Sequence, residues 1–295
     1  MQHTFPRLDE KGSQRYVAVT NRCCTTSLIA SRGPGLSMPT SFYPLPDDVE
    51  PSVREVLENV TSRLSSSREP PFQEVVFAGV GEPLLRWPIV REVVRSLRSH
   101  HAQLLELPRS TEIAEEQQVR PRGSAACTKP AEGAVPEEPY YTPLRLVTNG
   151  LWPVASQAVV APVPRSRSDG PGMSTRGVEV NGGRIGQEYG FGFLYEEGAD
   201  GAGALAAEVA ELFDAVSVAL NTADPLQYDQ IMEPSIKGLR PGSAHAIVCS
   251  FVRECAARGL RTECTVVNRD DVDVTSAREL ATKLGACCRA RPYLP

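Results

Sequence analysis

Short β-branched segments alternate with amphipathic stretches along this chain of 295 residues, and this alternation restricts the fold more than any other feature. Six segments have the composition of strands: 15–20, 74–78, 144–148, 215–220, 261–267 and 289–293. Helical periodicity lies between them, in 52–64, 87–100, 204–213, 245–258 and 276–284. Strands separated by helices favour right-handed parallel crossovers. We therefore expect an α/β fold, a barrel or an open doubly wound sheet, with ligands at the carboxyl ends of its strands.

Residues at the helix ends carry further signals. Thr275 is the expected N-cap of the last helix, and Gly285 is expected to end that helix. Gly259 similarly ends the helix before it. His245 begins its helix, where we expect an exposed histidine without a ligand role.

Two long stretches, 101–143 and 152–203, interrupt the alternation without sustained periodicity. We expect one domain over 1–295 that carries these stretches as two flexible insertions. The first joins a helix to the next strand, which places it on the face away from the ligand. The second follows the third strand and is expected on the ligand face, where it acts as a lid or as a spacer without a role.

Charge and cysteine usage exclude several classes of partner and location. With 31 basic and 36 acidic residues the net charge is -5, so no global basic field favours nucleic acid or an anionic membrane surface. No apolar run reaches the roughly 18 residues of a membrane span, and the start lacks a secretory signal. Eight cysteines do not form a secreted disulfide pattern, so we expect reduced thiols and an intracellular, cytoplasmic protein.

Polar segments follow four of the expected strands and should share one rim. These segments are 20–24, 79–83, 149–150 and 221–224. Gly79 and Gly81 permit close approach of a ligand to the backbone, Pro83 stiffens the turn, and the Glu82 carboxylate is suited to a ligand ammonium. The alternative for this segment is a tight turn in which Glu82 is solvated.

Five ordered passages give the chain a family resemblance. They are Tyr16 to Cys23 (YVAVTNRC), Val75 to Arg86 (VVFAGVGEPLLR), Arg145 to Leu151 (RLVTNGL), Asp214 to Asp224 with Tyr228 following, and the closing Arg289 to Tyr293 (RARPY). In this order and spacing the chain resembles the radical S-adenosylmethionine (SAM) superfamily, and within it the TatD-associated radical SAM proteins.

The resemblance implies a partial (β/α)6 TIM-like barrel. It also implies a four-iron, four-sulfur cluster held by three cysteines spaced Cys-x-x-x-Cys-x-x-Cys, whose open iron chelates S-adenosylmethionine for reductive cleavage. Gly81, Glu82 and Pro83, in the 79–83 rim with Gly79, would line the methionine amino group. Asn149 and Asn221 would lie near the ligand.

The cluster motif departs from the family at two of its three positions. Counted from Cys23, the second position is Ser27 and the third is Ala30. A hydroxyl that stays protonated at neutral pH is a poor iron ligand, and a methyl group is no ligand at all. The other cysteines are expected in helices, inside strands or in the far-face insertion, away from this rim. Cys23 and Cys24 are alternatively a reactive thiol pair.

The segment 31–35 (SRGPG) is either a surface turn or a cradle that binds an anion through backbone N–H groups and Arg32.

These observations predict a radical-SAM-like protein with lost cluster ligands, a pseudoenzyme or a module that binds S-adenosylmethionine or another small ligand. One alternative is an active enzyme, which holds a cluster through Cys23 and unconventional or partner-supplied ligands or catalyses another reaction with Glu82 and a cysteine. Another is a scaffold whose insertions capture a protein partner.

Overall fold

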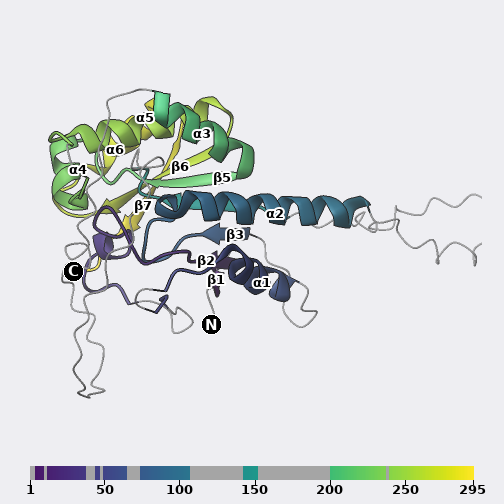
Figure 1. The fold of residues 1–295 in the computed structure, drawn as a ribbon. Coiled ribbons are helices and arrows are strands. Elements are labelled where there is room, and N and C mark those ends of the chain that lie inside the picture. Colours follow the sequence, from purple (N-terminus) through teal and green to yellow (C-terminus); the bar gives the residue numbers. More distant parts are fainter. Residues whose placement is uncertain are drawn as a thin grey trace, which may run out of the picture.

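The computed structural model describes residues 4–9, 12–37, 44–46, 49–64, 74–106, 142–151, 200–236 and 239–295. Its single sheet has seven strands in sequence order, and only β1 and β2 pair antiparallel. From β2 to β7 every neighbouring pair is parallel. The strands are β1 (Thr4–Asp9), β2 (Gly12–Val17), β3 (Glu74–Phe77), β4 (Leu144–Thr148), β5 (Ala215–Ala219), β6 (Arg261–Asn268) and β7 (Cys287–Pro292). The expected α/β class with a parallel sheet is confirmed (Figure 1).

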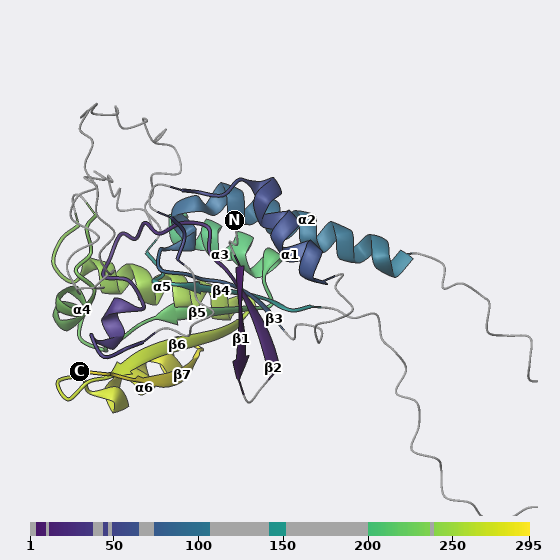
Figure 2. The same cartoon turned by 90° about the horizontal axis from the view of Figure 1, so that it is seen from below.

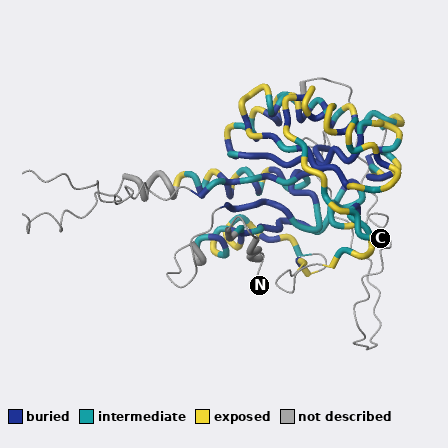
Figure 3. Tube along the Cα trace, turned by 180° about the vertical axis from the view of Figure 1, so that it is seen from behind, coloured by how far each residue is buried: buried dark blue, intermediate teal, exposed yellow. Residues whose placement is uncertain are grey.

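Helices cover the outer face of this sheet (Figures 1 and 2). They are α1 (Val53–Leu64), α2 (Trp87–Glu106), α3 (Asp200–Leu212), α4 (Pro225–Met232), α5 (Ser243–Ala257) and α6 (Val274–Lys283), with two 3-10 turns, η1 (Ala30–Arg32) and η2 (Pro83–Arg86). Alternate strand residues such as Phe77, Leu146 and Val218 pack against helix residues such as Val94 and Val252 in one core. Figure 3 shows the resulting layer of buried strands beneath partly exposed helices. The helices therefore leave the other face of the sheet, here called the inner face, for polar groups.

Segments from the two ends of the parallel sheet meet at its carboxyl side. The segment after β2 meets the segment after β7: the Leu294 N–H donates to the Arg32 carbonyl at 2.8 Å, and the Gly35 N–H donates to the Leu294 carbonyl at 3.0 Å. These bonds join the segments that follow the first and the last strand of the parallel part of the sheet. The arrangement is compatible with a TIM-like fold.

Several predicted boundaries differ from those of the structure, and two of them bear on the site. Thr275 is not the N-cap of α6, because Asp273 accepts hydrogen bonds from the N–H groups of Thr275 and Ser276. The first parallel strand ends at Val17 and not at residue 20. Beyond Val17 the chain runs beside the loop that follows β3: the Ala78 N–H donates to the Val17 carbonyl, and the Glu82 N–H donates to the Arg22 carbonyl.

One strand and one α-helix were not predicted at all. Strand β1 contains Pro6, which weakens a strand pattern but is tolerated at a sheet edge. Helix α4 begins with a specific signal, an Asp224 N-cap followed by Pro225. Gly285 and Gly259 end their helices with positive φ, as predicted.

The described elements shorten both expected insertions. Helix α2 continues to Glu106 and α3 begins at Asp200, so the residues outside the described part are 107–141 and 152–199. The predicted placement of the two insertions, and of Cys127, concerns residues outside the described part of the chain. In the part of the chain that the structure describes, none of the helices combines the length and apolar composition that a membrane span requires.

Candidate functional site

The carboxyl ends of β2, β3 and β4 bring three of the predicted site residues together. Cys23 follows β2, Glu82 follows β3 and Asn149 follows β4 directly. The Asn149 backbone N–H donates to Glu82 Oε2 at 2.7 Å, and its side-chain Nδ2 lies 3.7 Å from Cys23 Sγ. Because parallel strands end at one edge, residues 126 positions apart in sequence share this cluster.

Glu82 is buried and its carboxylate is fully engaged by the protein. Its side chain caps η2 by accepting from the Leu84 N–H at 2.9 Å, and Oε1 also accepts from Thr148 Oγ1 at 2.7 Å. With the Asn149 bond this makes three internal donors on a residue that is 1% exposed. The alternative of a solvated Glu82 is therefore wrong. Pro83 occupies the first position of η2, where it stiffens the turn as expected.

Burial of Glu82 predicts a specific pH dependence of stability. Desolvation raises its pKa from 4.5 to about 7, although the three hydrogen bonds oppose the rise. A pKa that is raised on folding gives stability below pH 4.5 that is lost as the pH rises towards 7. At about 1.4 kcal/mol for each pH unit the loss is about 3 kcal/mol. Urea unfolding across this range should show the decline in the wild type.

The matched variant is Glu82→Gln, whose amide does not titrate. It is expected to be less stable than the wild type, because its NH2 group opposes the Asn149 N–H, but to lack the decline that Glu82 produces. If the free energy of unfolding changed with pH in the same way in both proteins, Glu82 would not be the group that causes the decline.

Gly79 and Gly81 allow the chain's own backbone to approach. A Cβ on Gly81 would lie 2.5 Å from the carbonyl oxygens of Thr20 and Arg22, and one on Gly79 would lie 2.9 Å from the Cβ of Ala18. The Glu82 N–H also donates to the Arg22 carbonyl at 2.8 Å. The two loops are thus held together tightly.

This packing leaves acceptors at the rim. Residues 79–81 are partly exposed, and their three backbone carbonyls accept no hydrogen bond from any described residue. Carbonyl oxygens are the acceptors that an ammonium, with three N–H donors, requires.

Cys23 and Cys24 differ in exposure but both are held as neutral thiols. Burial raises the pKa of Cys23 to about 11, with a further contribution from the Glu82 charge. Burial also raises the pKa of Cys24 well above its ordinary value. Asn149 Nδ2 contacts both sulfurs and donates to Thr25 Oγ1 at 3.0 Å. The alternative of a reactive thiol pair lacks the electropositive surroundings it needs.

The other two family ligand positions do not supply donors for a cluster. The Ser27 hydroxyl accepts from the Ala30 N–H at 3.1 Å and so supports the start of η1. Ala30 is exposed and presents only a methyl group. The described residues contain no group of three or more His, Cys, Asp or Glu side chains placed to hold a metal ion. The donor set around Cys23 therefore does not fit a cluster held by three thiolates.

The remaining cysteines in the described residues lie where the sequence placed them. Cys249 and Cys255 are on α5, Cys264 is inside β6, and Cys287 and Cys288 begin β7. Hydrogen bonds from the N–H groups of Ser31, Arg32, Gly33 and Gly35 go to the chain's own carbonyls, so the segment 31–35 is a turn and not a backbone cradle for an anion.

Among the described residues, Asn221 makes no hydrogen bond to Cys23, Glu82 or Asn149. It has a positive φ of 58°, its side-chain Nδ2 contacts Met232 Sδ at 2.8 Å, and its backbone N–H donates to the Thr265 carbonyl. Met232 in turn accepts from the Thr26 N–H at 2.6 Å. Asn221 thus contributes to the arrangement of α4 beside the Cys23 loop.

No role was predicted for one buried residue near the cluster, Tyr228, and the exposure of another, His245, was predicted wrongly. Tyr228, on α4, lies with its hydroxyl 3.5 Å from the Asn149 carbonyl and is fully buried. His245 was expected to be exposed, but it is 5% exposed and its Nε2 donates to the Thr222 carbonyl at 3.1 Å. Its ring packs edge-on against Tyr228, and burial lowers its pKa, so it is neutral at pH 7. The Asp224-Pro225 signal for α4 was the available clue to Tyr228.

Comparison with protein-family models and with curated proteins gives no match for this chain.

Proposed function

We propose that this chain is a partial barrel of the radical SAM type that binds S-adenosylmethionine, or a related ligand with an ammonium group, at the Gly79–Pro83 loop. We also propose that it lacks reductive cleavage of that ligand. The sequential parallel order from β2 to β7 is compatible with such a barrel. On this proposal the chain is a ligand-binding module or pseudoenzyme.

The observation that carries the proposal is the set of unused carbonyls in residues 79–81. They lie at the carboxyl side of the sheet, on a loop that Glu82 fixes from inside and that Gly81 packs against the Cys23 loop. A rigid set of acceptors binds an ammonium without a large ordering cost. The loss of cleavage follows from Ser27 and Ala30, which give a cluster no thiolate.

Calorimetry with the full chain tests the binding part. S-adenosylmethionine should bind with measurable heat, and 5′-methylthioadenosine, which lacks the amino acid group, should bind at least about tenfold weaker, a difference of about 1.4 kcal/mol. Equal affinity for the two compounds would show that the 79–81 carbonyls do not bind the ammonium group. If S-adenosylmethionine does not bind to the folded protein, the proposed binding function is wrong.

The active-enzyme alternative depends on Cys23. This thiol is partly exposed beside Glu82 and Asn149, at the family's first ligand position. The alternative requires two further ligands from outside the motif, and it predicts a cluster that disappears when Cys23 is replaced.

A further inference from the structure

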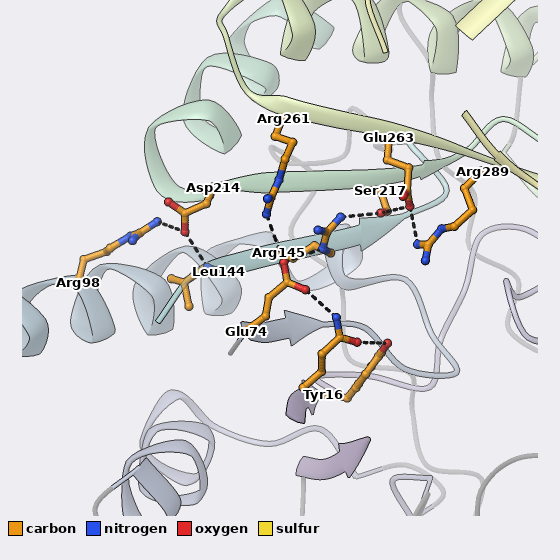
Figure 4. Close-up of polar contacts among 11 residues, drawn as sticks. Tyr16, Glu74, Arg98, Leu144, Arg145, Asp214, Ser217, Arg261, Glu263 and Arg289 are labelled. Atoms are coloured by element: carbon orange, nitrogen blue, oxygen red, sulfur yellow. Dashed lines mark hydrogen bonds and ion pairs between the residues drawn. The ribbon is translucent and has the colours of Figure 1, made fainter. Parts of the chain in front are cut away.

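A continuous polar network crosses the inner face of the sheet from β3 to β7 (Figure 4). Glu74 of β3 accepts from Arg145 of β4 at 2.8 Å. Arg145 reaches Ser217 of β5 at 3.2 Å, and Ser217 donates to Glu263 of β6 at 2.8 Å. Arg289 of β7 forms an ion pair with Glu263. Each carboxylate of this network therefore has a cationic partner in the folded chain.

The Asp229 carboxylate, on α4, differs because one of its oxygens has no partner. Its Oδ2 accepts from the Gly242 N–H at 2.5 Å, at the start of α5. Its Oδ1 is buried and accepts no hydrogen bond from any described residue. A buried acceptor without a donor is costly, and more so when it carries charge. A donor that reached Asp229 Oδ1 would therefore be strongly favoured.

A buried histidine lies in the first turn of α5, three residues after Gly242. The Nε2 of His245 donates to the Thr222 carbonyl at 3.1 Å, so Nδ1 carries no proton in this arrangement. The Cys249 sulfur lies 3.8 Å from Nδ1. The ring also packs edge-on against Tyr228, with the ring centroids 5.6 Å apart. These contacts all suit a neutral ring.

The surroundings of His245 determine how it responds to acid. Burial lowers its pKa, whereas the hydrogen bond to Thr222 and the charges of Asp224 and Asp229 oppose this effect. Among the described residues, these two aspartates are the charged groups that act on the ring. A proton at Nδ1 would find the Cys249 sulfur, which is only a weak acceptor. The protonated ring is therefore better stabilised by the Asp229 carboxylate than by its present partners.

Helix α4 connects this histidine to the loop that follows β2. Tyr228, against which the imidazole packs, is in the middle of α4. At the carboxyl end of α4, the Met232 carbonyl accepts from the Thr26 N–H at 2.6 Å. Just beyond α4, the Ser235 N–H donates to the Cys24 carbonyl at 2.8 Å. A displacement of α4 would therefore change the loop that packs against the proposed ligand site.

We propose that His245 is a pH-sensitive switch that controls how α4 contacts the loop after β2. At neutral pH the ring holds the Thr222 carbonyl and Tyr228. In acid a proton from solvent binds at Nδ1, and the ring leaves Thr222 to form an ion pair with Asp229 Oδ1. Helix α4 then moves, and its two hydrogen bonds to the loop open. This inference goes beyond the proposed function and needs no ligand.

Hydrogen exchange of the full chain, read by NMR at the Thr26 and Ser235 amides, tests the proposal. The wild type is compared with His245→Gln at the same pH, because the intrinsic exchange rate depends on pH and Glu82 is present in both proteins. The Gln amide can donate to the Thr222 carbonyl but does not titrate. At about pH 5 the wild type should exchange both amides at least about tenfold faster than His245→Gln, and at about pH 7.5 the two should match.

Two further variants separate the switch from general acid unfolding. Asp229→Asn keeps an acceptor for the Gly242 N–H but lacks the carboxylate, so its amides should stay protected at about pH 5 even where His245→Gln is unstable. Glu279→Gln, exposed on α6, should match the wild type at both pH values. Amides of the central strand β5 should stay protected throughout.

Three results would overturn the proposal. The first is equal exchange of the Thr26 and Ser235 amides in the wild type and His245→Gln at about pH 5. The second is exchange in Asp229→Asn that is as fast as in the wild type. The third is simultaneous exchange of the β5 amides, which would show that acid opens the whole fold and not α4.

Discussion

Replacement of Gly81 by alanine is expected to lower the free energy of unfolding by about 3 kcal/mol or more. The added methyl group would lie 2.5 Å from two carbonyl oxygens, of Thr20 and Arg22, and 2.7 Å from the carbonyl carbon of Asn21. These are backbone atoms, so no side-chain rotation relieves the overlap. Relief requires the β2 and β3 loops to separate, which also moves the 79–81 carbonyls. Urea denaturation measures the loss, and calorimetry measures the accompanying loss of ligand binding.

Gly203→Ala is the matched control for this variant. Gly203 lies inside α3, where a new Cβ would be 3.8 Å or more from its neighbours. Alanine is the better helix former by about 1 kcal/mol, so this substitution should leave stability unchanged or increase it. A Gly81→Ala protein as stable as Gly203→Ala would show that the two loops are not packed as described.

Removal of the Glu74 carboxylate is expected to be the second large effect. Glu74 is 6% exposed and pairs with Arg145, whose side chain is 18% exposed, so Glu74→Ala leaves a cation on the inner face without its carboxylate. Breaking such a buried pair costs about 3–5 kcal/mol. The midpoint of urea unfolding should fall accordingly.

A double variant separates the cost of the unpaired charge from the worth of the pair. Glu74→Ala combined with Arg145→Met removes both charges and should recover much of the lost stability. Glu58→Ala, which breaks the exposed pair between Arg54 and Glu58, should change stability by less than about 0.5 kcal/mol. Equal effects of Glu74→Ala and Glu58→Ala would contradict the buried network.

Strand and helix order could be predicted from the sequence because each element carries its own local pattern. Strand β4 begins and ends at the predicted residues, since Leu144–Thr148 is a short, apolar and β-branched run bounded by Pro143 and Asn149. Strand β1 escaped prediction because an edge strand with one neighbour tolerates Pro6 and needs no apolar alternation.

The rim could be located from the sequence, but its internal contacts could not. Parallel order alone places residues 23, 82 and 149 at one edge. That Glu82 is buried depends on donors from Thr148 and Asn149, more than 60 positions away. His245 is buried because α4 brings Tyr228 against it, and nothing in its own helix indicates this. Such contacts follow from tertiary packing and leave no local pattern.

The polar residues of the inner face could be found in the sequence, but their contacts could not. The closing Arg289 to Tyr293 passage was recognised only as part of a resemblance. The contact between Arg32 and the Pro292 carbonyl joins residues that are 260 positions apart in the sequence. Such a contact depends on the order of all the strands, so the sequence of β7 alone does not predict it.

The iron and acid-labile sulfide content of the full chain after anaerobic reconstitution tests the central claim most directly, with Cys23→Ala measured in parallel. Because Ser27 and Ala30 offer no thiolate, the account predicts that the wild type retains no more iron or sulfide than Cys23→Ala and shows no cluster absorbance. About four irons and four sulfides for each wild-type chain, lost in Cys23→Ala, would contradict it.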